Sequence, residues 1–400
     1  MKILTLLLAI VFITPLGAYA SILDSGEISK AHYSVSLPFK LVDNMMIVSL
    51  PIKGKNYHFM FDTGATNVLS NQAIKELGLK KRSYTIKLHD ISGEERESKL
   101  YKGPDLHIGD VSFTNFDFAA LDTLKDFPMS CFKLDGILGY NLLRHPAVAI
   151  DFQKNEITLS NAYQGNPVSE GYNPIGFSFY NDDAPQVAIF HQFGDLLLGI
   201  DTGKNNGITF NHPEMLSVLE NLGYKPDNRY TIDALGMYGL KEYDVRDYTL
   251  SNMNIGRVVL NDTRVTVQVK EGISLAGVGF LSYFKTIIDF PSRVLWLKPI
   301  SKEEDGLSLP RYGFNLDLTP DGKLLTSHVA KGMLAHQAGL KNGDQIIAIN
   351  GSNKSIFSQN DYCNVYLDKS NSLYISRSKR LNLTVLRKGK QKDISIYYKK

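Results

Sequence analysis

Hydrophobic and polar residues alternate along most of the chain with a period of two, in short runs that Gly, Asn and Asp residues interrupt. This period is typical of half-buried β-strands joined by tight turns. Helical patterns are few, and the two clearest cover Asn71 to Leu79 and Pro213 to Leu222. The pattern therefore predicts an all-β protein with a few short helices.

The chain contains an internal repeat. Residues 61–65 read Phe-Asp-Thr-Gly-Ala, and residues 200–204 read Ile-Asp-Thr-Gly-Lys. Downstream, Gly-Ile-Leu-Gly at 136–139 corresponds to Ala-Gly-Val-Gly at 276–279, at almost the same distance from the first motif. An Asp-Phe pair then follows in each copy, and one predicted helix follows each Asp-Thr-Gly motif. Several matching motifs in one order predict two structurally equivalent lobes.

Asp62 and Asp201 are the candidate catalytic residues of this repeat. Peptide hydrolysis without a metal or a covalent intermediate needs a base for water and an acid for the carbonyl. Two carboxylates that are close enough to share one proton supply both, because like charges at that distance cannot both ionise. The duplicated motif therefore indicates acid–base hydrolysis by a pair of aspartates.

The residues after each aspartate suit this pairing. Gly64 and Gly203 have no side chain to keep the two turns apart. Thr63 and Thr202 each have a hydroxyl that can bond across to the opposite turn. An apolar run precedes each motif, and it predicts a strand that presents the turn.

These motifs resemble the aspartic peptidase superfamily that includes pepsins and retropepsins, from about Pro38 to Pro299. The resemblance implies two homologous β-barrel lobes with a cleft between them, which we place at residues 21–165 and 166–300. It implies an aspartic endopeptidase that acts on peptides or proteins through Asp62 and Asp201. One chain supplies both aspartates, so a monomer is expected, without a metal or another cofactor.

Two supporting residues depart from the pepsin pattern. Ala65 lacks the hydroxyl that follows the glycine in pepsins, as in retropepsins. Lys204 occupies the equivalent position in the second copy. An inward ammonium would favour the doubly ionised pair and impair catalysis, whereas the usual behaviour of long Lys side chains places it in solvent. An inactive pseudoprotease that binds peptides is therefore the alternative function.

The resemblance also implies β-hairpin flaps that close over the substrate. Residues 90–93 and 236–239 are the expected tips of a flap in each lobe. Gly93, Tyr238 and Gly239 are therefore candidate substrate-binding residues, although Tyr238 suits an exposed turn equally well.

Residues 309–400 resemble a PDZ domain, after a polar linker at 301–308. The specific part is Ala338 to Gly351, which includes Gly-Leu-Lys-Asn-Gly-Asp. The resemblance implies a carboxylate-binding loop for a C-terminal peptide ligand at Tyr312, Gly313, Phe314 and Asn315. Residues 356–380, where the helix of the groove should lie, match poorly, and the alternative is a small β-domain that has no ligand or is docked on the protease. We expect this domain to fold alone and to be dispensable for cleaving short peptides.

The N-terminus predicts export. Lys2 precedes an apolar run from Ile3 to Phe12, and small residues at 18 and 20 precede Ser21. This arrangement is typical of a cleaved signal peptide at residues 1–20, and the run is shorter than the roughly 20 residues that span a bilayer. An uncleaved anchor is the alternative. The expected location is the periplasm or the extracellular space, without stable membrane insertion.

Composition narrows the remaining possibilities. The 400 residues carry 44 Lys and Arg against 41 Asp and Glu, a formal net charge of +3. So small a surplus argues against nucleic-acid binding.

The only two cysteines, Cys131 and Cys363, fall in different predicted domains. Export permits a disulfide, but two residues do not form a disulfide framework, and we expect two unpaired thiols.

Overall fold

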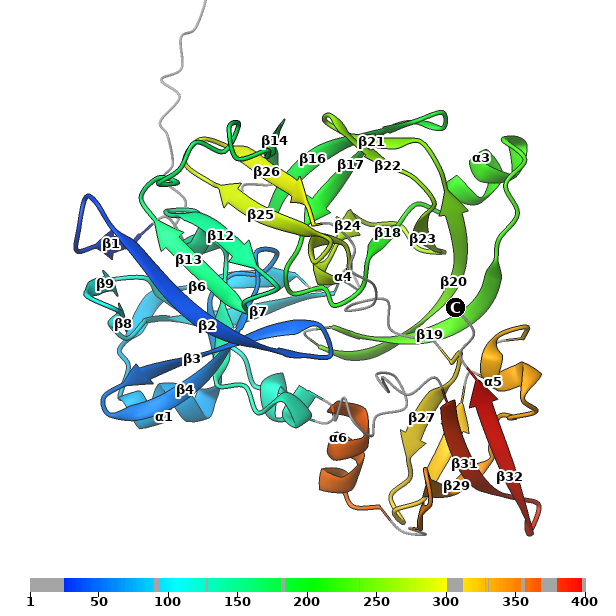
Figure 1. Ribbon diagram of the computed structural model, residues 1–400. Helices are drawn as coiled ribbons and strands as arrows, with labels where there is room; N and C mark the ends of the chain where they lie inside the picture. Colours follow the sequence, from blue (N-terminus) through cyan, green and yellow to red (C-terminus); the bar gives the residue numbers. More distant parts are fainter. Residues whose placement is uncertain are drawn as a thin grey trace, which may run out of the picture.

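The computed structural model describes residues 25–89, 94–126, 129–180, 184–236, 238–300, 312–327, 329, 331–353, 357–367 and 380–397. The predicted signal peptide, the 301–308 linker and Gly93 lie outside these residues. The fold is all-β, as predicted, and consists of extended sheets with a few short helices (Figure 1). No helix in the described part of the chain is both long and apolar enough to cross a membrane.

We call the elements before residue 161 the first lobe. Its helical elements are α1 (Asn71–Leu77), α2 (Tyr140–Leu143) and the 3-10 helices η2 (Thr123–Lys125) and η3 (Met129–Phe132). Its strands are β1 (Glu27–Ile28), β2 (Ser34–Val42), β3 (Met45–Ile52), β4 (Lys55–Phe61), β5 (Val68–Leu69), β6 (Lys81–His89), β7 (Glu95–Lys102), β8 (Leu106–Ile108), β9 (Val111–Thr114), β10 (Asp117–Ala120), β11 (Gly136–Leu138), β12 (Ala147–Asp151) and β13 (Glu156–Ser160).

The second lobe follows, up to residue 299. Its helices are α3 (Met215–Asn221) and α4 (Val278–Leu281). Its strands are β14 (Asn173–Gly176), β15 (Ser178–Tyr180), β16 (Ala184–His191), β17 (Gly194–Ile200), β18 (Ile208–Phe210), β19 (Asn228–Gly236), β20 (Gly239–Leu250), β21 (Met253–Ile255), β22 (Val258–Leu260), β23 (Thr263–Gln268), β24 (Ser274–Ala276), β25 (Phe284–Asp289) and β26 (Val294–Pro299). Helices α1 and α3 follow the two Asp-Thr-Gly motifs, as the repeat predicts.

The two lobes share one strand topology around the repeated motifs. In the first lobe β11 runs parallel to β4 and antiparallel to β5. In the second lobe β24 runs parallel to β17 and antiparallel to β18. Each apolar-Gly segment of the sequence therefore lies beside the strand that delivers an aspartate. This correspondence confirms that the sequence repeat is a structural repeat.

A shared sheet and a shared core join the lobes. Strand β12 of the first lobe pairs with β25 of the second, and Val148 lies opposite Ile288. Both side chains are fully buried in a single apolar cluster that extends through both lobes. Burial of this cluster is the main stabilising contribution to the pair of lobes, and it fixes one relative to the other.

The C-terminal domain is a separate sheet, drawn in yellow to red in Figure 1. Its helices are α5 (Leu334–Gln337) and α6 (Gln359–Leu367). Its strands are β27 (Asn315–Leu318), β28 (Leu324–Ser327), β29 (Gln345–Ile349), β30 (Ser352–Asn353), β31 (Arg380–Arg387) and β32 (Lys390–Tyr397). Helix α6 lies in the segment that the sequence matched poorly, so this segment does contain a helix.

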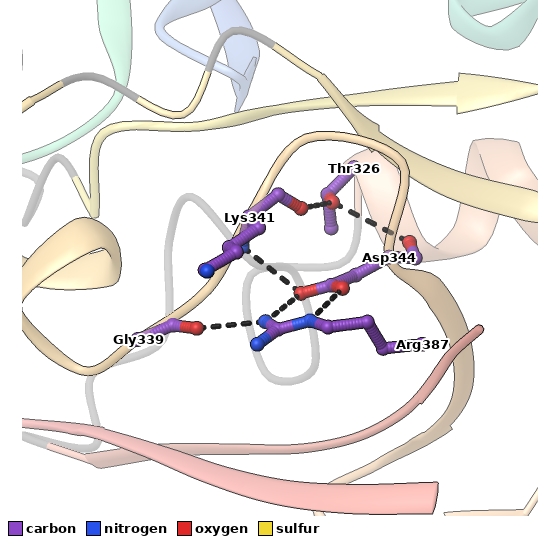
Figure 2. Close-up of polar contacts among 5 residues, drawn as sticks. All are labelled: Thr326, Gly339, Lys341, Asp344 and Arg387. Carbon is purple, nitrogen blue, oxygen red and sulfur yellow. Dashed lines mark hydrogen bonds and ion pairs between the residues drawn. The ribbon is translucent and has the colours of Figure 1, made fainter. Parts of the chain in front are cut away.

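An ion pair between Asp344 and Arg387 stabilises the turn at residues 339–344, which carries the PDZ-like motif. Figure 2 shows Asp344, which is 1% exposed and accepts from Arg387 through both of its carboxylate oxygens at 2.6 Å. The same guanidinium donates to the Gly339 carbonyl at 2.7 Å, and Asp344 also accepts from the Lys341 backbone at 2.9 Å. A buried carboxylate needs such partners. The motif Gly-Leu-Lys-Asn-Gly-Asp therefore fixes the turn that leads into β29.

The two cysteines form a disulfide, so the expectation of two unpaired thiols was wrong. Cys131 of η3 and Cys363 of α6 are bonded, with Cα atoms 5.0 Å apart and a sequence separation of 232 residues. Gln359 of α6 also donates to the Ser130 hydroxyl at 3.1 Å. The disulfide therefore cross-links the C-terminal domain to the first lobe.

Candidate active site

Two tight turns carry the candidate aspartates to the junction of the lobes. Asp62 follows directly on β4, and its backbone N–H donates to the Leu138 carbonyl of β11 at 3.0 Å. Asp201 follows β17, and its N–H donates to the Ala276 carbonyl of β24 at 3.0 Å. Equivalent backbone bonds therefore place both aspartates in equivalent positions.

Reciprocal threonine bonds hold the turns together. The Thr63 N–H donates to the Thr202 hydroxyl at 3.0 Å, and the Thr202 N–H donates to the Thr63 hydroxyl at 3.0 Å. Each hydroxyl then donates to a carbonyl of the opposite lobe, Thr63 to Ile200 at 2.7 Å and Thr202 to Phe61 at 2.9 Å. Both threonines are fully buried, so these four bonds are shielded from competing water.

Glycine allows the carboxylates to come this close. A Cβ atom on Gly203 would lie 2.2 Å from Asp62 Oδ2, and a Cβ atom on Gly64 would lie 2.8 Å from Asp201 Cγ. Contacts below 3.0 Å are sterically forbidden, so any other residue at either position would push the opposite aspartate away. Each glycine also donates its N–H to the aspartate of its own turn at 2.8 Å.

Burial makes it unfavourable for the pair to carry two charges. Burial and the nearby Asp201 charge raise the pKa of Asp62 well above its usual range. Burial also raises the pKa of Asp201, but the N–H of Gly203 and the charge of Lys204 oppose that shift. Burial therefore opposes ionisation of both carboxylates, and the Lys204 charge favours the ionised form of Asp201.

Ala65 and Lys204 make the two turns unequal. The Ala65 side chain packs against an apolar cluster of the first lobe. Lys204 is half-buried, and its ammonium donates to the Gly207 carbonyl at 3.1 Å. The expectation that Lys204 extends into solvent is therefore not met. Its positive charge remains close enough to lower the pKa of Asp201.

Two hairpins extend from the lobes and touch each other. They are formed by β6 with β7 and by β19 with β20. The half-buried Tyr238 belongs to the second hairpin, and its hydroxyl donates to the Leu88 carbonyl of the first at 3.1 Å. The Arg96 guanidinium lies 4.2 Å from the centroid of the Tyr238 ring. Tyr238 is therefore an interlobe contact, not an exposed turn residue, and Gly239 begins β20 beside it.

The predicted carboxylate-binding loop of the C-terminal domain precedes β27. Tyr312 and Phe314 are buried in the core of this domain, and Gly313 has the left-handed φ of +82°. A Cβ atom on Gly313 would lie 2.4 Å from Met333, so the loop requires glycine there. Asn315 is the first residue of β27 and pairs with Ser327.

The free edge of β27 is partly closed by α6. Strand β27 is an edge strand, and a peptide would extend the sheet there. Leu316 lies opposite Thr326, whose N–H donates to Asp344 instead of Leu316. The carbonyl of Leu316 therefore faces the free edge, and the buried Tyr362 of α6 donates its hydroxyl to it at 3.1 Å.

Comparison with protein families agrees with this geometry. Residues 48–142 match the aspartyl protease family, and residues 301–370 match the PDZ domain. The two matched segments are similar to an aspartyl protease domain and to a PDZ domain. No curated protein matches the chain. The protease match covers the first Asp-Thr-Gly turn and its β11 partner, but it ends before the second turn. The assignment of Asp201 therefore rests on the repeat and on the threonine bonds.

A series of hydrogen bonds between polar residues lies behind the first Asp-Thr-Gly turn. The sequence analysis did not predict it. The Asn67 side chain accepts from the Gly139 N–H at 2.7 Å, and the Asn141 side chain accepts from the Asn67 N–H at 2.6 Å. Asn141 in turn donates to the backbone carbonyl of Asp117 at 3.0 Å. The fully buried Asp117 carboxylate accepts from Arg82 of the first hairpin at 2.8 Å. This series of hydrogen bonds connects the segment after the first Asp-Thr-Gly turn to Arg82 of the first hairpin.

Replacement of Thr202 by valine tests the threonine bonds. Thr202→Val leaves the Thr63 N–H and the Phe61 carbonyl without their partners, and we expect a loss of about 3 kcal/mol in unfolding free energy. Thr286→Val is the control, because the buried Thr286 hydroxyl has no hydrogen-bond partner among the described residues. Urea unfolding of both variants makes the comparison. Equal stabilities would show that the threonine bonds do not hold the turns together.

Replacement of Tyr362 by phenylalanine tests whether the edge of β27 is closed. Tyr362→Phe frees the Leu316 carbonyl, so we expect labelled peptides with free C-terminal carboxylates to bind about fivefold more tightly, as fluorescence polarisation measures. Tyr397→Phe changes a tyrosine that is 52% exposed and should leave binding unchanged. Equal affinities for all three proteins would mean that Tyr362 does not compete with peptide.

Proposed function

We propose that the protein is an aspartic endopeptidase whose catalytic dyad is Asp62 and Asp201. The observation that carries this proposal is the close approach of the two carboxylates across the threonine-bonded turns. The match to the aspartyl protease family supports peptidase activity. The repeat supports a dyad with one aspartate from each lobe.

The proposed mechanism assigns different roles to the two carboxylates. Asp201 is the charged partner and removes a proton from the attacking water. Asp62 is the protonated partner and donates a hydrogen bond to the carbonyl oxygen of the scissile peptide. The Lys204 charge favours this assignment, because it lowers the pKa of Asp201 against the burial that raises the pKa of both carboxylates. Water adds to the carbonyl carbon, and a proton then passes to the nitrogen as the C–N bond breaks.

A second candidate function rests on Lys204. A cation beside the dyad favours the doubly ionised form, which holds no proton to donate to the carbonyl. If that form dominates, the chain binds peptides in its cleft without cutting them. The proposed endopeptidase and this pseudoprotease differ only in whether the pair retains its proton at the working pH.

The remaining assignments extend the same proposal. We assign residues 1–20 to a cleaved signal peptide, 21–165 and 166–300 to the two lobes, and 309–400 to the PDZ domain. The Cys131–Cys363 disulfide supports export to the periplasm or the extracellular space, since such bonds persist in oxidising compartments. One chain supplies both aspartates, which supports a monomer. The PDZ domain binds the C-terminal peptide of a substrate or a partner.

Replacement of either aspartate tests the dyad. Asp62→Asn and Asp201→Asn should each lower cleavage of a diverse peptide library about 1000-fold or more, because either change removes the shared proton. Mass spectrometry of the peptides measures the cleavage, and circular dichroism checks the fold. Asp195→Asn changes an exposed carboxylate on β17 and should retain activity. Full activity in one of the two dyad variants would overturn the assignment.

Replacement of Lys204 by methionine tests the asymmetry of the dyad. The cation lowers the pKa of Asp201, so its removal raises that pKa, and the charged base then forms only at higher pH. We expect the pH–rate profile of Lys204→Met to move to higher pH, while Lys204→Arg, which keeps the charge, should retain the original profile. Coincident profiles for the two variants would show that the charge at this position does not act on the dyad.

A further inference from the structure

The short helix η3 lies between the protease core and the PDZ core. Met129 and Phe132 pack into an apolar cluster of the first lobe. Cys131, between them, belongs instead to the core cluster of the PDZ domain, where Tyr362 and Leu316 are also buried. Neighbouring residues of one helical turn therefore point into two different cores.

The protease side of η3 reaches the candidate active site. The cluster that contains Phe132 also receives Ala65 of the first Asp-Thr-Gly turn. Leu88 of the first hairpin and Tyr238 of the second hairpin belong to the same cluster. Phe132 and Met129 therefore pack in one apolar cluster with Ala65 of the dyad turn and with a residue of each hairpin. We call this cluster the cleft wall.

The PDZ side of η3 is fixed by a covalent bond. Cys131 is bonded to Cys363 of α6, and Gln359 of α6 donates to Ser130. A four-residue 3-10 helix has little stability of its own and depends on its neighbours. Helix α6 is therefore one of the neighbours that hold η3, together with the cleft wall.

We propose that the Cys131–Cys363 disulfide makes the PDZ domain a positioning element of the protease cleft. Cys131 and Cys363 are positioning residues, because they act on the substrate through Met129 and Phe132 and touch neither substrate nor dyad. This proposal rests on the proposed endopeptidase function. It replaces the expectation that the PDZ domain is dispensable for cleaving short peptides.

Reduction of the disulfide is the direct way to release η3. A dithiol such as dithiothreitol attacks one sulfur, the S–S bond breaks, and a second attack closes the reagent into a cyclic disulfide. The dithiol supplies two electrons and two protons, so Cys131 and Cys363 become free thiols. Cys363 is half-buried and Cys131 is 4% exposed, so the first attack occurs at the sulfur of Cys363.

Release of η3 should weaken substrate binding more than it slows the chemical step. The threonine bonds and the carboxylates lie outside η3 and keep their geometry. The cleft wall loses its fixed position, so we expect KM for a short peptide to rise about tenfold, with a change in kcat below about twofold.

The experiment compares the full chain with and without dithiothreitol, beside the double variant Cys131→Ser with Cys363→Ser. Mass spectrometry counts the free thiols, and KM and kcat are measured for a short peptide that the oxidised protein cleaves. The double variant should behave like the reduced wild type and should not respond to the dithiol. An unchanged KM in fully reduced protein would overturn the proposal.

Hydrogen exchange separates this proposal from the endopeptidase function. The amides of residues 129–134 and 238–241 should exchange at least about tenfold faster in the double variant, whether or not any peptide is cleaved. Amides of the dyad turns at 62–64 and 201–203 should keep their protection. If no peptide is cleaved in any state but exchange rises as expected, the endopeptidase proposal fails while the role of the disulfide stands. Unchanged exchange at 129–134 and 238–241 would overturn the role of the disulfide.

Discussion

The reciprocal bonds between Thr63 and Thr202 are the constraint on which the site depends. They join one turn from each lobe, and the bonded groups are buried where water cannot replace them. The bonds form only if both strands end in register, which the pairs β4–β11 and β17–β24 ensure. They also bring the two carboxylates together, which only glycine at positions 64 and 203 permits. The strand topology, the sequence repeat and the proposed chemistry therefore all depend on Thr63 and Thr202.

The two turns are equivalent in backbone geometry but differ in their surroundings. Behind the first turn, side chains of Asn67 and Asn141 connect the dyad to Asp117 and to the first hairpin. Behind the second, the Lys204 ammonium bonds to a backbone carbonyl of its own loop. The residue after the glycine is the neutral Ala65 in the first turn and the cationic Lys204 in the second. The Lys204 charge opposes the rise in pKa that burial causes at Asp201. This difference gives each carboxylate a different proposed role.

Sequence reasoning found the features that are local or repeated. The Asp-Thr-Gly motifs, the paired apolar-Gly segments and the helices after each motif all have periodic or duplicated signals, and the structure places them as predicted. The Cys131–Cys363 bond was not predictable, because a separation of 232 residues leaves no local pattern. The contact of Tyr238 with Leu88 depends on how two hairpins from different lobes approach each other. Helix α6 has a weak sequence signal, since its position depends on packing against β27 and η3.

The shared proton of the dyad is measured most directly by NMR titration of protein with ¹³C-labelled aspartate carboxyls. The signals of Asp62 and Asp201 are assigned by their loss in the corresponding asparagine variants. A coupled, buried pair predicts two separate titration steps, with the upper step well above the usual range for aspartate. Loss of both protons together near the ordinary aspartate pKa would contradict a shared proton, and with it the proposed acid–base mechanism.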